Sequence, residues 1–222
     1  MRRIFTLIGC CITVVGFSQL QVGTRLLSGQ FNLDHGNTIQ EGSGIYNKSR
    51  ATWSRLELGL QKLYKPNRIR GVGVGFVHSN QQVTRATGVG TDRETERTII
   101  RGMSVQYFEQ VLFPFGTKWY GTITMGGRAE YSFEHQKGER GSSNKYDNYQ
   151  FIMGVAPGVA YHFHKRWLAD FSLGQLAALN VVHRKWHNNN VDDLRYQRTN
   201  VYLSSLLTGL TSFSVGFRYI LR

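Results

Sequence analysis

The sequence predicts an all-β protein, an eight-stranded antiparallel up-and-down transmembrane β-barrel. Three observations predict it. Long stretches of the chain alternate between apolar and polar residues, which is the period of a β-strand and not of a helix. The joints between these stretches are short turns and long polar segments in regular succession. An apolar segment with the features of an export signal precedes them.

The composition of the 222-residue chain limits the class of protein. Lys and Arg number 27 against 14 Asp and Glu, which gives a net charge of +13, and aromatic residues make up 13%. A mean hydropathy of −0.32 excludes a bundle of transmembrane helices. The many aromatic residues argue against disorder. Two cysteines, Cys10 and Cys11, cannot make a disulfide-dense scaffold or a four-thiolate zinc site.

Residues 1–18 have the pattern of a cleaved signal peptide. Two arginines precede an apolar run that is too short to span a membrane. The small residues Gly16 and Ser18 favour cleavage before Gln19, and lipid attachment at a cysteine of the run is the alternative. We therefore expect a single mature domain, 19–222, that is exported to the cell outer membrane.

Glycine, proline, asparagine and charged residues divide the mature chain into eight alternating segments. The predicted strands are 23–34, 51–64, 68–80, 98–113, 117–135, 148–164, 166–182 and 199–221. Tight turns are predicted at 64–67, 114–116 and 164–166, and long polar loops at 35–50, 81–97, 136–147 and 183–198. Short periplasmic turns at one end and long extracellular loops at the other are typical of an outer-membrane barrel.

Four of these segments show the alternation most clearly. Leucine occupies every second position of 55–61, and bulky apolar residues alternate with glycine over 71–76. The longest unbroken alternation runs over 122–133, and the last one over 212–221. Slipping the register of 122–133 by one residue would expose two charged side chains to hydrocarbon, so the pattern also predicts which face is outside.

The polar face is predicted to line the lumen, because a sheet in hydrocarbon must close on itself and turn its apolar face to lipid. Three arginines and three acids fall on the inward face, and an eight-stranded barrel is just wide enough for such side chains to fill it. We expect them to pair and plug the interior, and a narrow conducting pore is the alternative. The predicted charge network is Arg55, Glu57, Arg128, Glu130, Asp170 and Arg218.

Aromatic residues near the strand ends predict two interfacial girdles on the apolar face. The alternative is a soluble barrel whose aromatic side chains line a ligand cavity. By strict phase Glu109 also lies on the lipid face, which is tolerable near an interface, or else its strand contains a phase slip. The predicted interface aromatics are Tyr64, Phe113, Trp119, Tyr131, Phe133, Tyr149, Tyr161, Phe163, Trp167, Phe217 and Tyr219.

Several stretches resemble a known family. The segments 23–29, 104–116, 155–163 and 212–219 are similar to the outer membrane protein β-barrel domain of Bacteroidetes-type bacteria, a group similar to the eight-stranded barrels of the OmpA/OmpX type. The resemblance covers nearly the whole mature chain. It implies an outer-membrane barrel of a Gram-negative cell envelope and no single activity.

The function expected from these observations is a non-enzymatic one, in envelope structure or surface interaction. The alternatives are a small, porin-like diffusion pore and a barrel enzyme that acts on lipid A or on peptides. The candidate catalytic set for such an enzyme is His78 and Ser79 with Glu134 and His135, although nothing in their spacing demands it.

We expect no cofactor, no catalytic residue and no metal site. His162 and His164 are two residues apart beside a turn, and we interpret them as a solvated pair rather than metal ligands. The expected partners are outer-membrane lipid, lipopolysaccharide and the export and barrel-assembly machinery. Nucleic-acid binding is disfavoured by the export signal despite the high charge, and a monomer is expected.

Overall fold

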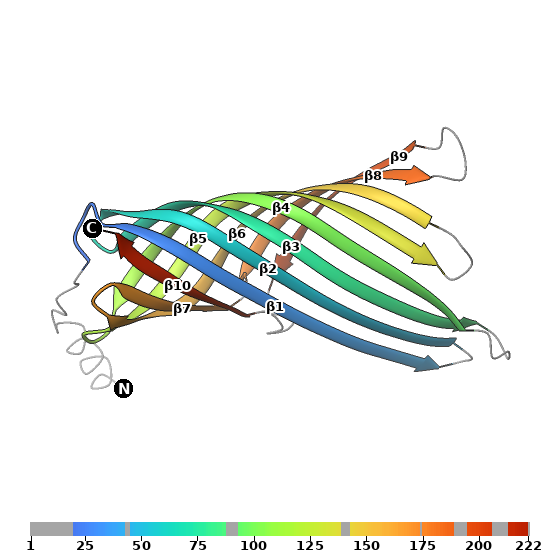
Figure 1. Cartoon of the computed structure of the whole chain (residues 1–222), viewed down its shortest axis with the longest axis horizontal. Helices are drawn as coiled ribbons and strands as arrows, with labels where there is room; N and C mark the ends of the chain where they lie inside the picture. Colours follow the sequence, from blue (N-terminus) through green and yellow to red (C-terminus); the bar gives the residue numbers. More distant parts are fainter. Residues whose placement is uncertain are drawn as a thin grey trace, which may run out of the picture.

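The computed structural model describes residues 20–42, 45–87, 93–138, 143–173, 175–188, 195–205 and 213–221, and these residues form a single antiparallel sheet (Figure 1). The predicted signal peptide, 1–18, lies outside the described residues. No described helix is long and apolar enough to cross a membrane. The strands are β1 (Arg25–Gly42), β2 (Ile45–Lys65), β3 (Arg68–Thr87), β4 (Arg93–Pro114), β5 (Trp119–Gly138), β6 (Ser143–His164), β7 (Trp167–Leu173), β8 (Ala177–Asn188), β9 (Arg195–Ser205) and β10 (Phe213–Leu221).

Eight of these strands close into a ring. The hydrogen-bonded order runs β1, β2, β3, β4, β5, β6, β7 and β10, and β10 pairs again with β1. Every pairing in the ring is antiparallel, and the start of β1 and the end of β10 lie at the same end of the barrel (Figure 1). The predicted up-and-down barrel of eight strands is confirmed.

The seventh and eighth strands of the predicted barrel are each divided in two. The last part of β6 pairs with β7, and its first part pairs with β8. Pro157 lies between these two ladders, so its missing N–H interrupts neither of them. β9 pairs with β8, whereas β10 pairs with β7 and β1. The predicted range 199–221 contains most of β9 and all of β10, and residues 206–212 between them lie outside the described residues.

Among the described residues, the strand pairing closes the ring at the short-turn end but not over part of the far end. Beyond the Leu33–Phe213 pair, the rest of β1 pairs only with β2 among the described residues, and β9 pairs only with β8. The hairpin of β8 and β9 stands apart from the end of β1 (Figure 1). The complete ring therefore belongs to the part of the barrel that contains β7 and β10.

The stretches predicted as long polar loops are largely strand. β5 and β6, for example, stay paired from Trp119–Tyr161 as far as Lys137–Ser143. The ranges 35–50, 81–97, 136–147 and 183–198 contain the corresponding ends of the other hairpins. Polar and charged residues occupy most positions of these four ranges in the sequence, so the apolar alternation that marks a strand stops although the backbone ladder continues.

In a soluble barrel the apolar face of the wall points inward, whereas in this barrel it points outward. Phe31, Leu56, Phe76 and Met103 are in register on four neighbouring strands, and all four point outward and are exposed. Away from the short turns, most inward positions carry small or polar residues, and many are buried. The ring is therefore apolar outside and polar inside.

Glycines on the inward face make room for larger side chains. A Cβ on Gly71 would lie 2.7 Å from Cζ of Phe108, and one on Gly102 would lie 2.6 Å from the backbone oxygen of Tyr131. Real Cβ contacts are not that short, so both positions require glycine or a shift of the wall. The alternation of glycine with bulky residues over 71–76 thus fits the lumen on one face and the apolar exterior on the other.

Candidate functional site

The lumen is closed at the short-turn end by an apolar plug. Each strand of the ring contributes one inward-facing residue to it, next to its turn or chain end, and Leu20 from the segment before β1 packs against them. The leucines, the isoleucine of β3 and the tyrosine among them are at most 6% exposed. The residues of this plug are Leu20, Leu26, Leu63, Ile69, Leu112, Tyr120, Ala160, Leu168 and Ile220.

An ion pair lies directly above the plug. Arg218 of β10 and Asp170 of β7 face each other with two close contacts, Nε to Oδ2 at 2.6 Å and Nη2 to Oδ1 at 2.7 Å. The two parallel contacts are the strong, bidentate form of an arginine–carboxylate pair. This pair ties the seventh and eighth strands of the ring together.

Four further charges form a cluster across the middle of the lumen. Arg55 and Glu57 come from β2, and Arg128 and Glu130 come from β5, which is three strands away around the ring. Nη2 of Arg55 donates to Oε2 of Glu130 at 2.5 Å, and Nη1 of Arg128 lies 3.5 Å from Oε1 of Glu57. Because each arginine contacts a carboxylate of the other strand, the cluster braces opposite sides of the barrel.

Each arginine of the cluster also contacts the glutamate two residues further along its own strand. Nε of Arg55 is 3.7 Å from Oε1 of Glu57, and Nε of Arg128 is 3.6 Å from Oε2 of Glu130. The amide of Gln106 donates to Glu57 at 3.0 Å. All six charged residues predicted for the lumen are thus inside it, two in the Asp170–Arg218 pair and four in the middle cluster.

A third group of polar residues lies further toward the hairpin ends. Glu134 accepts hydrogen bonds from Arg184 at 2.6 Å, from Gln136 at 2.7 Å and from Asn148 at 3.1 Å. The guanidinium of Arg184 also stands 3.7 Å from the centre of the Tyr146 ring. Burial is the main cause that raises the pKa of the Tyr146 hydroxyl. Sequence reasoning placed Glu134 in a predicted strand but missed its contact with Arg184, because 136–147 and 183–198 were predicted as loops.

The space between these charges is a cavity of about 390 Å³, lined by both polar and apolar side chains. Several buried polar atoms that face it have no hydrogen-bond partner among the described residues, including Nε of Arg128, Nη1 of Arg218 and Oε1 of Gln110. Unpartnered polar atoms in a space of this size are satisfied by water. We therefore expect water in the lumen above the plug.

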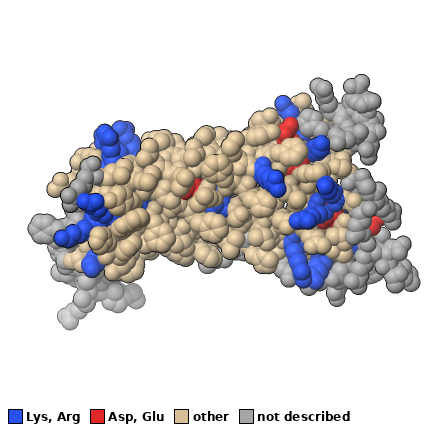
Figure 2. Space-filling view, in the orientation of Figure 1, with Lys and Arg blue, Asp and Glu red and all other residues tan. Residues whose placement is uncertain are grey.

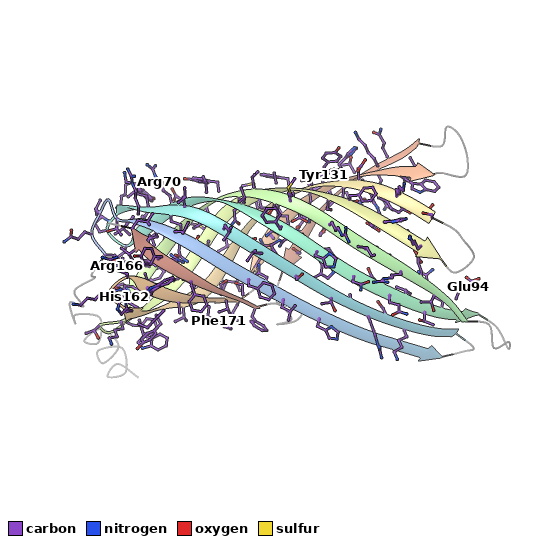
Figure 3. The ribbon with its side chains drawn as sticks, in the orientation of Figure 1. Arg70, Glu94, Tyr131, His162, Arg166 and Phe171 are labelled. Atoms are coloured by element: carbon purple, nitrogen blue, oxygen red, sulfur yellow. The ribbon has the colours of Figure 1, made fainter. Side chains whose placement is uncertain are left out.

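The predicted interface aromatics all lie on the outer face. At the short-turn end Trp119 packs against Tyr161, with ring centres 4.4 Å apart, and Trp167 packs against Tyr219 at 5.0 Å. Toward the other end Tyr131 packs against Tyr149, and Figure 3 shows Tyr131 on the outside of the wall. The remaining members of the set, also outward, are Tyr64, Phe113, Phe133, Phe163 and Phe217.

The candidate catalytic residues are separated by the wall. Ser79 and Glu134 point inward and are buried, whereas the neighbouring His78 is exposed on the outer face. His135 also turns outward and contacts the Ser143 hydroxyl at 3.0 Å. A histidine that follows or precedes a strand residue by one position must face the opposite side, so these residues cannot form a serine–histidine–acid set.

The described residues contain no group of three or more His, Cys, Asp or Glu side chains placed to hold a metal ion. His162 and His164 are separated by a register shift at the end of β6. His162 is 4% exposed and points inward, whereas His164 is exposed. The interpretation of both as a solvated pair is therefore wrong for His162, because its side chain is buried.

The plug was also missed by sequence reasoning, although the sequence contains a signal for it. Its members occupy inward positions, where the alternation calls for a polar residue, and each comes within a few residues of a turn or chain end. Leu63, for example, follows Arg55, Glu57 and Gln61 on the same face. An apolar residue in the polar phase at the same end of every strand indicates a layer that closes the lumen.

Taken together, the outward apolar face, the paired lumen charges and the two aromatic girdles are the architecture of a transmembrane β-barrel of the outer-membrane type. Hydrocarbon accepts the outer face, and the closed ring leaves no free edge in the part that β7 and β10 complete. The central body of the barrel shows little surface charge, and Lys and Arg gather at its two ends (Figure 2).

No family model matches the chain, and a comparison with curated proteins finds no match. Solved structures resemble it. The attachment invasion locus protein Ail of Yersinia pestis is 9% identical, with a TM-score of 0.42 over 90% of this chain and 100% of its own. For the outer membrane protein OprG of Pseudomonas aeruginosa the values are 14%, 0.41, 91% and 97%.

A major outer membrane protein from Thermus thermophilus is 12% identical, with a TM-score of 0.46 over 89% of this chain and 99% of its own. These likenesses concern general architecture and assign no activity. The chain is an outer-membrane β-barrel, a conclusion that its own faces, girdles and lumen support.

Proposed function

We propose that this protein is a non-conducting, non-enzymatic barrel that serves in envelope structure or surface interaction. The observation that carries the proposal is the apolar plug. Leu26, Ile69 and Leu168 are fully buried in it, and side chains from all eight ring strands meet there. An ion that crossed this layer would lose its hydration without gaining a polar partner, which is prohibitively costly.

The charges above the plug support the same proposal. The middle cluster and the Asp170–Arg218 pair are each electrically neutral, with three arginines and three carboxylates in all. Their side chains span the lumen instead of lining an open channel. An enzymatic role has no support from the described residues, because the candidate serine and histidines face opposite sides of the wall.

The hairpins beyond the apolar band support a role in surface interaction. β3 and β4 remain paired out to Ala86–Arg93, and β5 and β6 out to Lys137–Ser143. Charged and polar side chains dominate these ends, which extend as paired ribbons rather than loose loops (Figures 1 and 2). We propose that the barrel acts as a monomer among outer-membrane lipid and lipopolysaccharide, after export and assembly by the envelope machinery.

The test is electrical conductance in planar lipid bilayers. The wild-type barrel should show no sustained channel openings, whereas Leu63→Ala combined with Leu168→Ala should open a water path through the plug and produce them. Large, stable channels in the wild type would contradict the proposal. Folding of the barrel is verified in parallel by its altered mobility in unheated gel samples. An absence of conductance then reflects a sealed lumen and not an unfolded chain.

A further inference from the structure

Three cations stand in one row on the outer face at the short-turn end. Arg25 of β1 is paired directly with Lys62 of β2, and Lys62 is paired with Arg70 of β3. All three side chains are exposed and point outward. Residues paired in this way have their Cβ atoms about 5 Å apart, so like charges in the row repel one another.

The protein balances the charges in this row only in part, and the Arg70 guanidinium lies 5.1 Å from the centre of the Tyr64 ring. Among the described residues no ion pair joins a carboxylate to Arg25, Lys62 or Arg70. The row continues to Glu109, which faces Arg70 on the neighbouring strand and accepts a hydrogen bond from Tyr107 at 3.5 Å. Three cations against one carboxylate leave the row with an excess of positive charge.

The row follows immediately on the apolar band. The next outward residues along the same three strands, toward the hairpin ends, are Leu27, Leu60 and Val72, which are paired with each other and exposed. Arg25, Lys62 and Arg70 therefore lie where hydrocarbon gives way to lipid headgroups. Arginine and lysine at this depth extend their charged ends to the headgroup phosphates.

The rest of the same rim has a different chemistry. Over β5, β6, β7 and β10 the outward side chains near the same end include the paired rings of Trp119–Tyr161 and Trp167–Tyr219. Arg166 on that side is engaged by the Tyr219 hydroxyl at 2.9 Å. The short-turn end carries Lys and Arg but no visible Asp or Glu in Figure 2, and Figure 3 places Arg70 and Arg166 there.

We propose that Arg25, Lys62 and Arg70 form a binding site for the phosphate of an anionic phospholipid headgroup in the membrane leaflet at the short-turn end. The acyl chains would lie against the Leu27, Leu60 and Val72 row. A lipid with a net negative charge fits because the row holds more positive charge than a zwitterionic headgroup can balance. The inference rests on the proposed membrane-embedded barrel and adds the lipid class that one sector of its rim selects.

The test measures lipid binding to the folded barrel by native mass spectrometry. Short-chain phosphatidylglycerol and phosphatidylcholine are titrated separately into the detergent-solubilised protein. The wild type should bind phosphatidylglycerol more tightly, and Arg25→Gln, Lys62→Gln and Arg70→Gln should each weaken that binding about fivefold, since one Lys or Arg near an anionic surface contributes roughly that factor. Phosphatidylcholine binding should change little.

The matched control is the triple variant Lys65→Gln, Lys118→Gln and Lys165→Gln. It removes the same charge from the same rim, but all three lysines are exposed at turns outside the row. The site predicts that this control keeps the preference for phosphatidylglycerol and that Arg25→Gln/Lys62→Gln/Arg70→Gln loses it. Equal loss in both triple variants, or no preference in the wild type, would overturn the proposal.

Two further measurements distinguish this lipid site from a site for free phosphate and from a failure of the membrane barrel itself. Glycerol phosphate without acyl chains should fail to displace the lipid, and displacement at equal concentration would show a site for free phosphate instead. Folding of each variant is followed by gel mobility in phosphatidylcholine vesicles. A wild type that does not fold there contradicts the membrane barrel itself, whereas a folded barrel without lipid preference contradicts only the site.

Discussion

Removing one carboxylate from the middle charge cluster should strongly destabilise the barrel. In Glu130→Gln, Arg55 loses its 2.5 Å partner and Arg128 loses a contact at 3.6 Å, so two arginines share Glu57. Breaking one partner of a buried ion pair costs about 3–5 kcal/mol. Because the Arg55 side chain is 18% exposed, we expect a loss near the lower limit, about 3 kcal/mol in the free energy of unfolding.

A double-mutant cycle shows whether the loss comes from the contact itself. Arg55→Gln should cost about 2 kcal/mol alone, because Arg128 still faces both carboxylates. The double variant Arg55→Gln/Glu130→Gln should cost about 3 kcal/mol, which leaves a coupling energy of about 2 kcal/mol. The assay is urea unfolding in lipid vesicles, followed by tryptophan fluorescence.

The control cycle uses an ion pair outside the lumen. Arg85 and Glu96 are 3.9 Å apart on β3 and β4, and their side chains are 61% and 34% exposed. An exposed pair of this kind should show a coupling of at most about 1 kcal/mol. If Arg55 and Glu130 coupled no more strongly than this control, the cluster would not brace the barrel and the reasoning about the lumen would be wrong.

Two other substitutions test the plug and the wall. Leu168→Ala, at a position with no exposed surface, should lower the free energy of unfolding by about 2–4 kcal/mol in the same assay, and Leu60→Ala on the lipid face by clearly less. Gly102→Ala should cost about 1–3 kcal/mol because its Cβ would meet a backbone oxygen at 2.6 Å, whereas Gly29→Ala, with its nearest atom at 3.7 Å, should be nearly neutral. Equal effects within either pair would contradict the packing described here.

The register of the central strands could be predicted from sequence because lipid and lumen impose opposite demands on alternate residues. Arg128 and Glu130 could face only inward, and Glu109 could face lipid only near a headgroup region. β4 indeed runs without a phase slip, and Glu109 lies opposite Arg70 at the border of the apolar band. The six lumen charges followed from the same rule, but their partners depend on which strands oppose each other across the ring.

The parts that could not be predicted are those where alternation carries no information. Beyond the membrane both faces of a hairpin are solvated, so strand and loop have similar compositions there. The Glu134–Arg184 contact could therefore not be predicted from the sequence. The division of the last two strands depends on β6 changing partners near Pro157. The plug was visible in principle, because Leu63 and Ile69 break the polar phase on either side of one turn.

The most direct test of the whole account is a spin-label scan of residues 122–131 in lipid vesicles. Each position is replaced in turn by a labelled cysteine in a chain that otherwise lacks cysteine, and its accessibility to oxygen is measured. The structure places Ile123, Met125 and Tyr131 on the exposed outer face and Thr122 and Glu130 inside. Accessibility should therefore oscillate with a period of two residues and peak at odd numbers. A flat profile, a helical period or peaks at even numbers would contradict the inside-out barrel.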